Sequence, residues 1–405
     1  MSSTKEKIRV LRIINRFNLG GPTFNVAYLS KYLDDRFETL LVGGIKDESE
    51  ASSEFITDSL GLKPKTISEM KRSISLSADW RSYKEINQII KDFKPHIVHT
   101  HAAKSGTLGR LAAIKNDVPV ILHTFHGHVF HSYFNRIKTT IFKVIERYLA
   151  KHSTRIIAIS NIQKKELGEL HRIASPDRIE VVPLGFDLSR FQEDQSQKRA
   201  QFRATYNLNE NDVAVGIIGR LVPIKNHEMF LKAVANISIA NPKARFFITG
   251  DGESKQHLLG VAKSLGIGYT EQAPPSQESP LCFTSWIREI DVVMAGLDIV
   301  SLCSLNEGTP VSLIEAQSAT KPVVSTTVGG IEDIVIENQS ALLCSVEDQG
   351  TFDAHLETLI LNDAKRQEMG EVGKRHVIDK YSYVRLVSDM ENLYSTLLRE
   401  NGVVI

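Results

Sequence analysis

The sequence contains little cysteine and no long apolar segment. Its three cysteines, Cys282, Cys303 and Cys344, lie far apart in 405 residues and form no CxxC pair. Such spacing indicates neither a disulfide framework nor a zinc site, and it fits a reducing compartment. No run approaches the roughly 18 apolar residues of a membrane span, and the polar residues 1–9 lack the pattern of a signal peptide. We therefore expect a cytoplasmic protein without a membrane-spanning helix.

Two short motifs are also missing. No GxGxxG sequence follows the first predicted strand, so the residues do not support a dinucleotide-binding domain. No Asp-x-Asp pattern offers an obvious metal site for a diphosphate. A lone acidic pair, Glu332 and Asp333, is better explained as a helix cap.

The net charge of +1 conceals a strong asymmetry. Residues 1–190 contain 30 Lys or Arg and 20 Asp or Glu, a net of +10, whereas residues 191–405 contain 19 and 28, a net of −9. Two such halves can face different partners, and the basic half suits nucleic acid, an anionic membrane or a phosphorylated acceptor. Attraction between the halves explains the asymmetry equally well, so both interpretations stay open.

Strand and helix patterns alternate along the chain. Predominantly apolar runs such as Ile8–Ile14 and Val213–Ile218 are typical of strands in a parallel sheet, and helical patterns follow them. Pro183–Asp187 interrupts the alternation before it restarts, so we place a domain boundary near residues 187–195. The predicted fold class is α/β, with two Rossmann-like, doubly wound domains. A ligand is expected in the cleft that they form at the carboxyl ends of their strands.

The functional argument depends on the stretch Ser304–Ala316 of the second domain. It leaves an apolar run, turns at Asn306–Gly308 and starts a helix with Pro310 at or near the first helical position. The free N–H groups and dipole of a helix N-terminus suit a phosphate. Glu307 and Glu315 are costly there unless they bind neutral hydroxyls, as a sugar or ribose offers. The stretch therefore indicates a nucleotide-sugar site, and an ordinary strand–turn–helix crossover is the alternative.

Two cations follow the first strand of the same domain. Arg220 and Lys225 come two and seven residues after Val213–Ile218, where a parallel sheet presents side chains to its ligand crevice. Arg supplies paired donors and Lys a point charge, and together they suit a diphosphate. A solvated loop is the alternative.

The first domain is rich in histidine near two predicted strand ends. Seven of the thirteen histidines fall between residues 96 and 131, among them His99, His101 and His126. No carboxylate or thiol accompanies them with ligand spacing, which argues against zinc. We expect His126 to contact the reacting sugar, although all of these histidines could be structural.

Two further segments of the first domain are ambiguous. Gly20 and Gly21 offer a bare backbone to a phosphate or sugar, or form a simple tight turn. Tyr133–Lys143 mixes aromatic, apolar and basic residues at helical spacing. It suits an anionic membrane surface, or equally a core-facing helix with a basic outer face.

These residues resemble a known family, the retaining glycosyltransferases of family 4. The stretch from Glu307 to Glu315 is similar to the Glu-x7-Glu motif of that family. The other similar segments are Gly219–Lys225, Gly250–Gly252 and Pro322–Gly330 in the second domain, and Pro95–His101, Lys104–Arg110 and His123–Phe130 in the first. The first-domain segments are similar to a branch of bacterial polysaccharide and lipid-sugar transferases, and the likeness covers nearly the whole chain.

The resemblance implies a GT-B fold whose second domain binds most of the donor nucleotide. It implies an acceptor-side domain of residues 1–188 with a crossover helix at about 380–405, and a donor domain of residues 189–379. It also implies that no metal ion or other cofactor is needed. The implied roles are sugar contact by His126 and Glu307, ribose binding by Glu315, diphosphate binding by Arg220 and Lys225 with the amides of Gly308 and Thr309, and closure on the donor by Gly20 and Gly21.

The second domain departs from the family pattern in three places. Ala319-Thr320-Lys321 replaces the common Ala-Gly-x, and Ser285 stands where glycine is usual. Tyr269–Pro280 is unusually polar and rich in proline. These departures leave the nucleotide base undetermined.

We therefore predict a retaining, metal-independent glycosyltransferase of bacterial surface glycan synthesis. It would move a hexose-type sugar from a nucleotide diphosphate sugar to a hydroxyl acceptor. The expected partners are a nucleotide sugar and a glycan or lipid-linked acceptor, not nucleic acid. Contact with the inner face of the cell membrane is left open by the basic half. The alternatives are a GT-B nucleotide-sugar epimerase or phosphorylase, and a non-catalytic nucleotide-sugar-binding protein.

Overall fold

The computed structural model describes residues 6–17, 21–45, 54–71, 73, 75–126 and 136–403. Gly20 and the first residues of Tyr133–Lys143 lie outside these ranges. The chain divides into two compact units, one formed by Met1–Phe186 with Tyr381–Ile405 and the other by Asp187–Lys380. Each unit is built on a parallel seven-stranded sheet, which confirms the predicted fold class.

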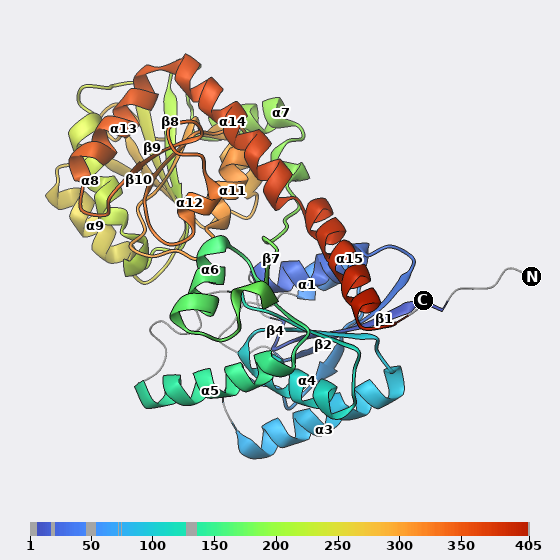
Figure 1. Ribbon diagram of the computed structural model, residues 1–405. Helices are drawn as coiled ribbons and strands as arrows, with labels where there is room; N and C mark the ends of the chain where they lie inside the picture. The colour runs from blue at the N-terminus through green and yellow to red at the C-terminus, as the bar shows by residue number, and fades with distance from the viewer. Residues whose placement is uncertain are drawn as a thin grey trace, which may run out of the picture. The chain divides into compact units, whose positions relative to one another are not determined.

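The sheet of the first unit has the strand order β3-β2-β1-β4-β5-β6-β7 (Figure 1). The winding reverses between β1 and β4, so the carboxyl ends of these strands flank the position where a doubly wound sheet binds its ligand. The strands are β1 (Ile8–Ile14), β2 (Phe37–Gly44), β3 (Lys65–Ile67), β4 (Ile97–His101), β5 (Val120–Thr124), β6 (Arg155–Ala158) and β7 (Ile179–Val181). The α-helices are α1 (Gly21–Tyr32), α2 (Glu54–Ser59), α3 (Leu76–Phe93), α4 (Ala103–Lys115), α5 (Arg136–His152), α6 (Asn161–Lys165) and α15 (Tyr383–Glu400).

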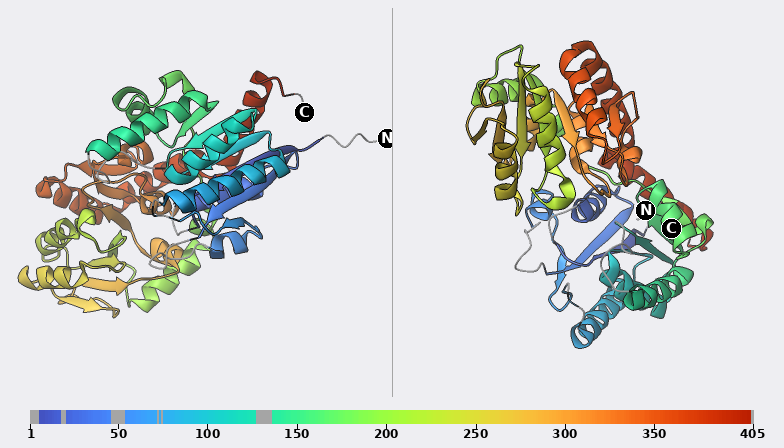
Figure 2. Two further views of the ribbon diagram at one scale, coloured as in Figure 1. Left: turned by 90° about the horizontal axis from the view of Figure 1, so that it is seen from below. Right: turned by 90° about the vertical axis from the view of Figure 1, so that its left-hand side faces the viewer.

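Strand alternation sends side chains of the first sheet into two cores. Val10 and Ile97 pack with Tyr394 of α15, whereas Leu11 and Val98 face the core that α3 and α4 cover. Figures 1 and 2 show α3 and α4 on one face of this sheet and α1 and α15 on the other. Residues at even positions of β1 and odd positions of β4 therefore point toward α15.

Helix α15 begins where Ser382 interrupts the helical run. The hydroxyl of Ser382 accepts a hydrogen bond of 3.2 Å from the amide of Val384 and so caps the helix. The amide of Tyr383 also donates to the carbonyl of Phe186, at 3.0 Å. These bonds fix the start of the helix that completes the first unit.

The sheet of the second unit has the order β10-β11-β9-β8-β12-β13-β14 and reverses its winding between β8 and β12. The strands are β8 (Val213–Ile218), β9 (Ala244–Thr249), β10 (Tyr269–Glu271), β11 (Leu281–Ser285), β12 (Ile299–Leu302), β13 (Val323–Thr326) and β14 (Ala341–Cys344). The α-helices are α7 (Gln195–Thr205), α8 (His227–Ile237), α9 (Lys255–Ser264), α10 (Ile290–Gly296), α11 (Val311–Ser318), α12 (Ile331–Ile334), α13 (Gln349–Leu361) and α14 (Asp363–Tyr381).

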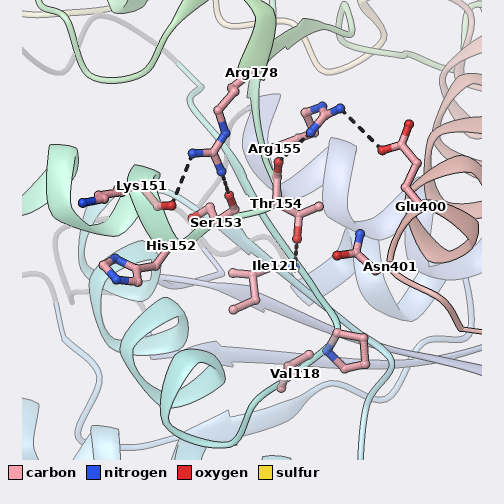
Figure 3. A pocket seen from close by; sticks show the side chains of 11 residues that line it. Val118, Ile121, Lys151, His152, Ser153, Thr154, Arg155, Arg178, Glu400 and Asn401 are labelled. Atoms are coloured by element: carbon pink, nitrogen blue, oxygen red, sulfur yellow. Dashed lines mark hydrogen bonds and ion pairs between the residues drawn. The ribbon is translucent and has the colours of Figure 1, made fainter.

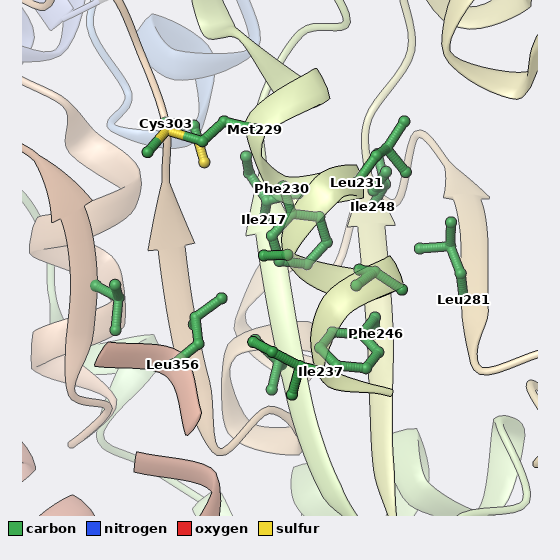
Figure 4. Close-up of a cluster of buried hydrophobic side chains, with 14 of the residues drawn as sticks. Ile217, Met229, Phe230, Leu231, Ile237, Phe246, Ile248, Leu281, Cys303 and Leu356 are labelled. Atoms are coloured by element: carbon green, nitrogen blue, oxygen red, sulfur yellow. The ribbon is translucent and has the colours of Figure 1, made fainter. Parts of the chain in front are cut away.

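Aromatic side chains anchor helices on both faces of the second sheet. Phe230 of α8 packs on Phe246 of β9 with ring centroids 6.1 Å apart, within the core of Figure 4. On the opposite face, Phe202 of α7 lies 5.2 Å from Phe247. The polar segment after the domain boundary is therefore a helix held by one buried aromatic ring. No helix of the described residues is both long and apolar enough to cross a membrane.

Candidate functional site

The predicted donor residues follow neighbouring strands of the second sheet. Arg220 and Lys225 follow β8, and Glu307 follows β12, which pairs with β8 in parallel. Because carboxyl ends of parallel strands meet at one sheet edge, the structure brings these residues to the point where the winding reverses. This is the expected ligand position of such a sheet.

Lys225 and Glu307 form an ion pair. Lys225 Nζ donates to Glu307 Oε1 over 2.5 Å, and the hydroxyl of Ser304 donates to the same oxygen over 2.5 Å. The amide of Leu305 donates to the carbonyl of Ile224 over 2.9 Å and ties the two loops together. Oε1 is therefore fully used, whereas Oε2 has no partner among the described residues and can accept a hydroxyl.

The turn that contains Glu307 rests on a pair of glycines after β13. Gly329 has a left-handed φ of +53°, and a Cβ there would lie 1.8 Å from the carbonyl oxygen of Glu307. A Cβ on Gly330 would lie 2.0 Å from the carbonyl oxygen of Gly308. Only glycine fits at both positions, so the backbone of Gly329 and Gly330 packs directly against the backbone of the turn.

Helix α11 begins directly after this turn. Pro310 is its N-cap and Val311 its first helical residue, so the helix starts one residue later than Pro310. Within the described part of the chain, the amides of Gly308 and Thr309 donate to no backbone carbonyl. A Cβ on Gly308 would meet only open space. Free amides and a helix N-terminus at one place suit an anion.

Glu315 lies further along α11 and is about one-fifth exposed, at 19% of its side chain. Burial raises the pKa of Glu315 to about 7, and the cation of Arg190 opposes this rise from 3.9 Å away. Arg190 belongs to the short 3₁₀ segment Ser189–Phe191 just after the domain boundary. The sequence reasoning missed Arg190 because its partner lies far away along the chain.

Arg220 is exposed, and its side chain has no hydrogen bond or ion pair with any of the described residues. Its guanidinium is therefore wholly available to an anionic ligand, whereas the ammonium of Lys225 already donates one proton to Glu307. Two of the departures from the family pattern have a common backbone geometry. Ser285 and Thr320 stand where glycine is usual, and both have left-handed φ values, +62° and +63°. A side chain at such a position costs on the order of 1–3 kcal/mol.

In the first unit, a polar layer lies at the carboxyl edge of the sheet. Arg12 of β1 and His99 and His101 of β4 are fully buried under α15. Arg12 Nη1 lies 3.0 Å from His99 Nδ1 and 3.4 Å from His101 Nε2, and Arg12 Nη2 donates to Tyr394 Oη over 3.1 Å. His101 Nδ1 lies 2.8 Å from His126 Nε2. The structure thus connects His126 to a buried arginine through His101.

Four described histidines near this edge, His99, His101, His123 and His126, are neutral at physiological pH. Burial is the main cause that lowers the pKa of His99, His101 and His123 well below the ordinary value. Burial also lowers the pKa of His126 to about 3. Each ring therefore has one N–H donor and one acceptor nitrogen, and its contacts decide which is which.

The backbone is strained next to His101. Ala102 has φ +71° and ψ 164°, a region that is almost restricted to glycine. The hydroxyl of Ser105 donates to the carbonyls of His101 and Ala102 and helps to hold this turn. Nothing in the sequence pattern indicated the strain, because alanine is an ordinary first-turn residue.

Gly20 lies outside the described residues, and Gly21 is the first residue of α1. A Cβ on Gly21 would lie 3.7 Å from Leu184, an ordinary contact, so packing does not demand glycine there. The predicted contact of both glycines with the donor stays a prediction.

No three His, Cys, Asp or Glu side chains of the described residues form a group that could hold a metal ion. Whether the reaction needs a metal ion is a separate question, and the metal-independent reaction stays a prediction.

A polar pocket of the first unit lies away from these residues (Figure 3). Its lining includes Thr154, which precedes β6, so the pocket lies at the amino end of that strand. Arg178 Nη1 donates to the carbonyl of Lys151 over 3.2 Å, and Arg155 pairs with Glu400 at 3.5 Å. Both of its arginines are already paired within the protein, and a doubly wound sheet binds ligands at the opposite edge.

Two family models match consecutive parts of the chain. The model described as Glycosyltransferase Family 4 matches residues 19–190, and the model described as Glycosyl transferases group 1 matches residues 198–376. Together they span most of the chain and meet near the boundary of the two units. The chain belongs to glycosyltransferase family 4.

Relatives of this family 4 glycosyltransferase act on different acceptors. The UDP-Gal:alpha-D-GlcNAc-diphosphoundecaprenol alpha-1,3-galactosyltransferase of Escherichia coli is 28% identical over 397 residues, which cover 97% of this chain and 98% of the relative. A D-inositol 3-phosphate glycosyltransferase of Segniliparus rotundus is 25% identical over 312 residues, which cover 75% and 66%. The predicted family is confirmed, and this glycosyltransferase acts on a nucleotide sugar.

Solved structures confirm the GT-B fold. Anabaena Alr3699/HepE in complex with UDP matches this glycosyltransferase with a TM-score of 0.79 at 16% identity, over 96% of this chain and 100% of that one.

Proposed function

We propose that this glycosyltransferase is a retaining, metal-independent enzyme that transfers a hexose from a UDP-hexose to a lipid-diphosphate-linked sugar. The donor and acceptor classes are supported by the likeness to the E. coli galactosyltransferase, which is similar over nearly its full length. The observation that carries the proposal is the Lys225–Glu307 pair beside the free amides before α11.

The proposed chemistry uses the contacts of that pair. The amides of Gly308 and Thr309 and the guanidinium of Arg220 bind the donor diphosphate. Lys225 Nζ keeps two further protons for phosphate oxygens while it holds Glu307, and Glu307 Oε2 accepts a sugar hydroxyl. These groups stabilise charge on the leaving diphosphate.

The transfer step conserves the anomeric configuration. The bond from C1 of the sugar to the diphosphate oxygen breaks, and the acceptor oxygen bonds to C1 on the same face. The leaving diphosphate takes the proton of the acceptor hydroxyl. The cations of the site take the part that a divalent metal would otherwise play, so chelation by EDTA should leave the rate unchanged.

The direct test is a transfer assay with UDP-, GDP- and ADP-hexoses and a GlcNAc-diphospholipid acceptor, with the anomeric configuration of the product determined by NMR. Glu307→Gln should lose most turnover, whereas Glu347→Gln, which changes an exposed carboxylate of the same unit, should lose none. An inverted product or an EDTA-sensitive rate would contradict the mechanism. Full activity of Glu307→Gln would contradict the site.

We also propose that the first unit binds the inner face of the cell membrane through α5. Ile141, Val144 and Tyr148 share one outward face of this helix and are 56%, 56% and 52% exposed. Residues 136–152 contain five Lys or Arg and a single acid, Glu146. Glu146 is buried in an ion pair of 2.7 Å with Arg110, so the exposed faces of α5 carry no negative charge. An apolar stripe with basic neighbours suits an anionic lipid surface.

Co-sedimentation with vesicles tests the membrane proposal independently of activity. Binding to vesicles with anionic lipid should exceed binding to neutral vesicles and should weaken with salt. Val144→Glu should reduce it, whereas Ile239→Glu, which changes a 90% exposed side chain of the second unit, should not. Equal binding of both variants would contradict the assignment to α5.

A further inference from the structure

The polar layer of the first unit contains one group whose hydrogen-bonding direction is fixed. Arg12 is buried and can only donate hydrogen bonds, because a guanidinium has no acceptor atom. Its neighbours are neutral: Tyr394, His99 and His101. Burial raises the pKa of Tyr394, which keeps the phenol protonated. The direction of every hydrogen bond in the layer can therefore be derived from Arg12.

The branch through His99 ends within the protein. Tyr394 Oη accepts from Arg12 and lies 2.6 Å from His99 Nδ1, so the phenol donates to that nitrogen. His99 must then be protonated on Nε2, which lies 2.7 Å from Thr124 Oγ1. All ring nitrogens of this branch have partners.

The branch through His101 ends at an atom without a partner. An N–H on His101 Nε2 would point at the guanidinium 3.4 Å away, so Nε2 is the acceptor and Nδ1 has the proton. His101 Nδ1 then donates to His126 Nε2 over 2.8 Å. His126 is left with its proton on Nδ1, a buried atom with no partner in the described part of the chain. A buried donor without a partner is costly unless a ligand oxygen accepts from it.

We propose that Arg12, acting through His101, sets the tautomer of His126, so that His126 presents Nδ1–H as a hydrogen-bond donor to a sugar oxygen. Arg12 and His101 are positioning residues in this proposal. The Nε2 lone pair of His126 is already used, so His126 donates to the sugar and does not act as a general base. The contact of His126 with the sugar rests on the proposed function, whereas the tautomer is a property of the protein alone.

Two substitutions of His101, by asparagine and by aspartate, have nearly the same shape as each other. Comparing them tests the direction of the hydrogen bond between His101 and His126. Asparagine can accept from Arg12 with its oxygen and donate to His126 Nε2 with its amide, which keeps the tautomer. Aspartate can only accept, so it pairs with Arg12 and requires His126 to be protonated on Nε2. NMR of the full-length protein with isotope-labelled histidine ring nitrogens distinguishes the two tautomers, and His126→Gln identifies the His126 signals.

The proposal expects Nδ1–H on His126 in the wild type and in His101→Asn, and Nε2–H in His101→Asp. Tyr394→Phe removes a partner of Arg12 outside the His101 branch and should leave the His126 tautomer unchanged. The same tautomer in both His101 variants, or a change in Tyr394→Phe, would overturn the proposal. If His101→Asp does not fold, the proposal depends on Arg12→Met, which should lose the preference for Nδ1–H.

Turnover separates this proposal from the proposed function. His101→Asp should turn over at least about tenfold more slowly than His101→Asn, the equivalent of one lost hydrogen bond. Opposite tautomers with equal turnover would support the role of Arg12 and contradict the contact of His126 with the sugar.

Discussion

Replacing Glu315 by glutamine should stabilise the second unit at alkaline pH relative to the parent protein. Burial raises the pKa of Glu315 from 4.5 to about 7 in the folded protein, with Arg190 opposing. An acid whose pKa is higher in the folded state contributes stability below its unfolded pKa, and this contribution is lost as pH rises through the folded pKa. The pKa difference between the folded and unfolded states corresponds to about 3 kcal/mol of unfolding free energy. This contribution is lost as the pH rises from about 4.5 to about 7. Glutamine does not titrate, so the unfolding free energy of the Glu315→Gln protein does not show this decrease.

The two tryptophans allow the second unit to be observed alone. Trp80 lies in the first unit and Trp286 in the second, and the chain has no other tryptophan. The comparison uses the Trp80→Phe protein with and without Glu315→Gln, and urea unfolding is followed by Trp286 fluorescence. Below about pH 4.5 the unfolding free energies of the two proteins should depend on pH in the same way. Above pH 7 Glu315→Gln should gain about 3 kcal/mol relative to the parent, beyond any constant offset. Parallel curves from pH 4 to pH 8 would refute the raised pKa.

Three other changes have defined outcomes. Arg220→Ala should lose on the order of 2–4 kcal/mol of transition-state stabilisation in steady-state kinetics with an unaltered melting temperature. An unchanged kcat/KM would remove Arg220 from the site. Thr320→Gly should raise the free energy of unfolding by about 1 kcal/mol because it relieves a left-handed β-branched residue, and a loss of stability in urea titration would contradict that geometry. Glu146→Ala should cost about 3–5 kcal/mol because it leaves Arg110 buried without its partner, and a change below about 1 kcal/mol would show that the pair is solvated.

Most strands could be predicted because both faces of a parallel sheet are buried. Ile8–Ile14 and Val213–Ile218 have the predicted bounds, since each is a predominantly apolar run. The edge strands β3 and β10 have three residues each, with mixed polarity, and give no such signal. Helix α7 was hidden for the opposite reason: its sequence is almost wholly polar, and only Phe202 and Arg203 are buried.

The location of the proposed donor residues at one sheet edge could be predicted because each of them follows a predicted strand of a parallel sheet. Strand order was not needed to propose that Arg220 and Glu307 lie at one edge, because all carboxyl ends of a parallel sheet do. The ion pair of Lys225 with Glu307 was not predicted, since it depends on side-chain reach between loops 82 positions apart. The proximity of Arg190 to Glu315 likewise depends on how the segment after the boundary packs on α11.

The polar layer of the first unit could not be predicted, although one signal existed. Arg12 lies within a strand whose only other polar residue is Arg9, and alternation places Arg12 on the same face as Val10. Its contacts come from residues 87 and 382 positions away, so they require the sheet order and the place of α15. A charged residue inside a buried strand indicates a polar layer more strongly than the nearby histidines do.

Lys225, which is half-buried, and Arg12, which is fully buried, have different kinds of partner. Lys225 faces a carboxylate, and this pairing offsets much of the cost of removing charge from water. Arg12 is fully buried with only neutral partners, an arrangement that costs several kcal/mol and gains little stability. The strained backbone of Ala102 lies at the end of the strand that carries His99 and His101. Two costly features at one sheet edge are expected at a functional site and not in a structural core. We therefore infer that the destabilising features at the carboxyl end of β4 serve to fix His126 Nδ1–H as a hydrogen-bond donor.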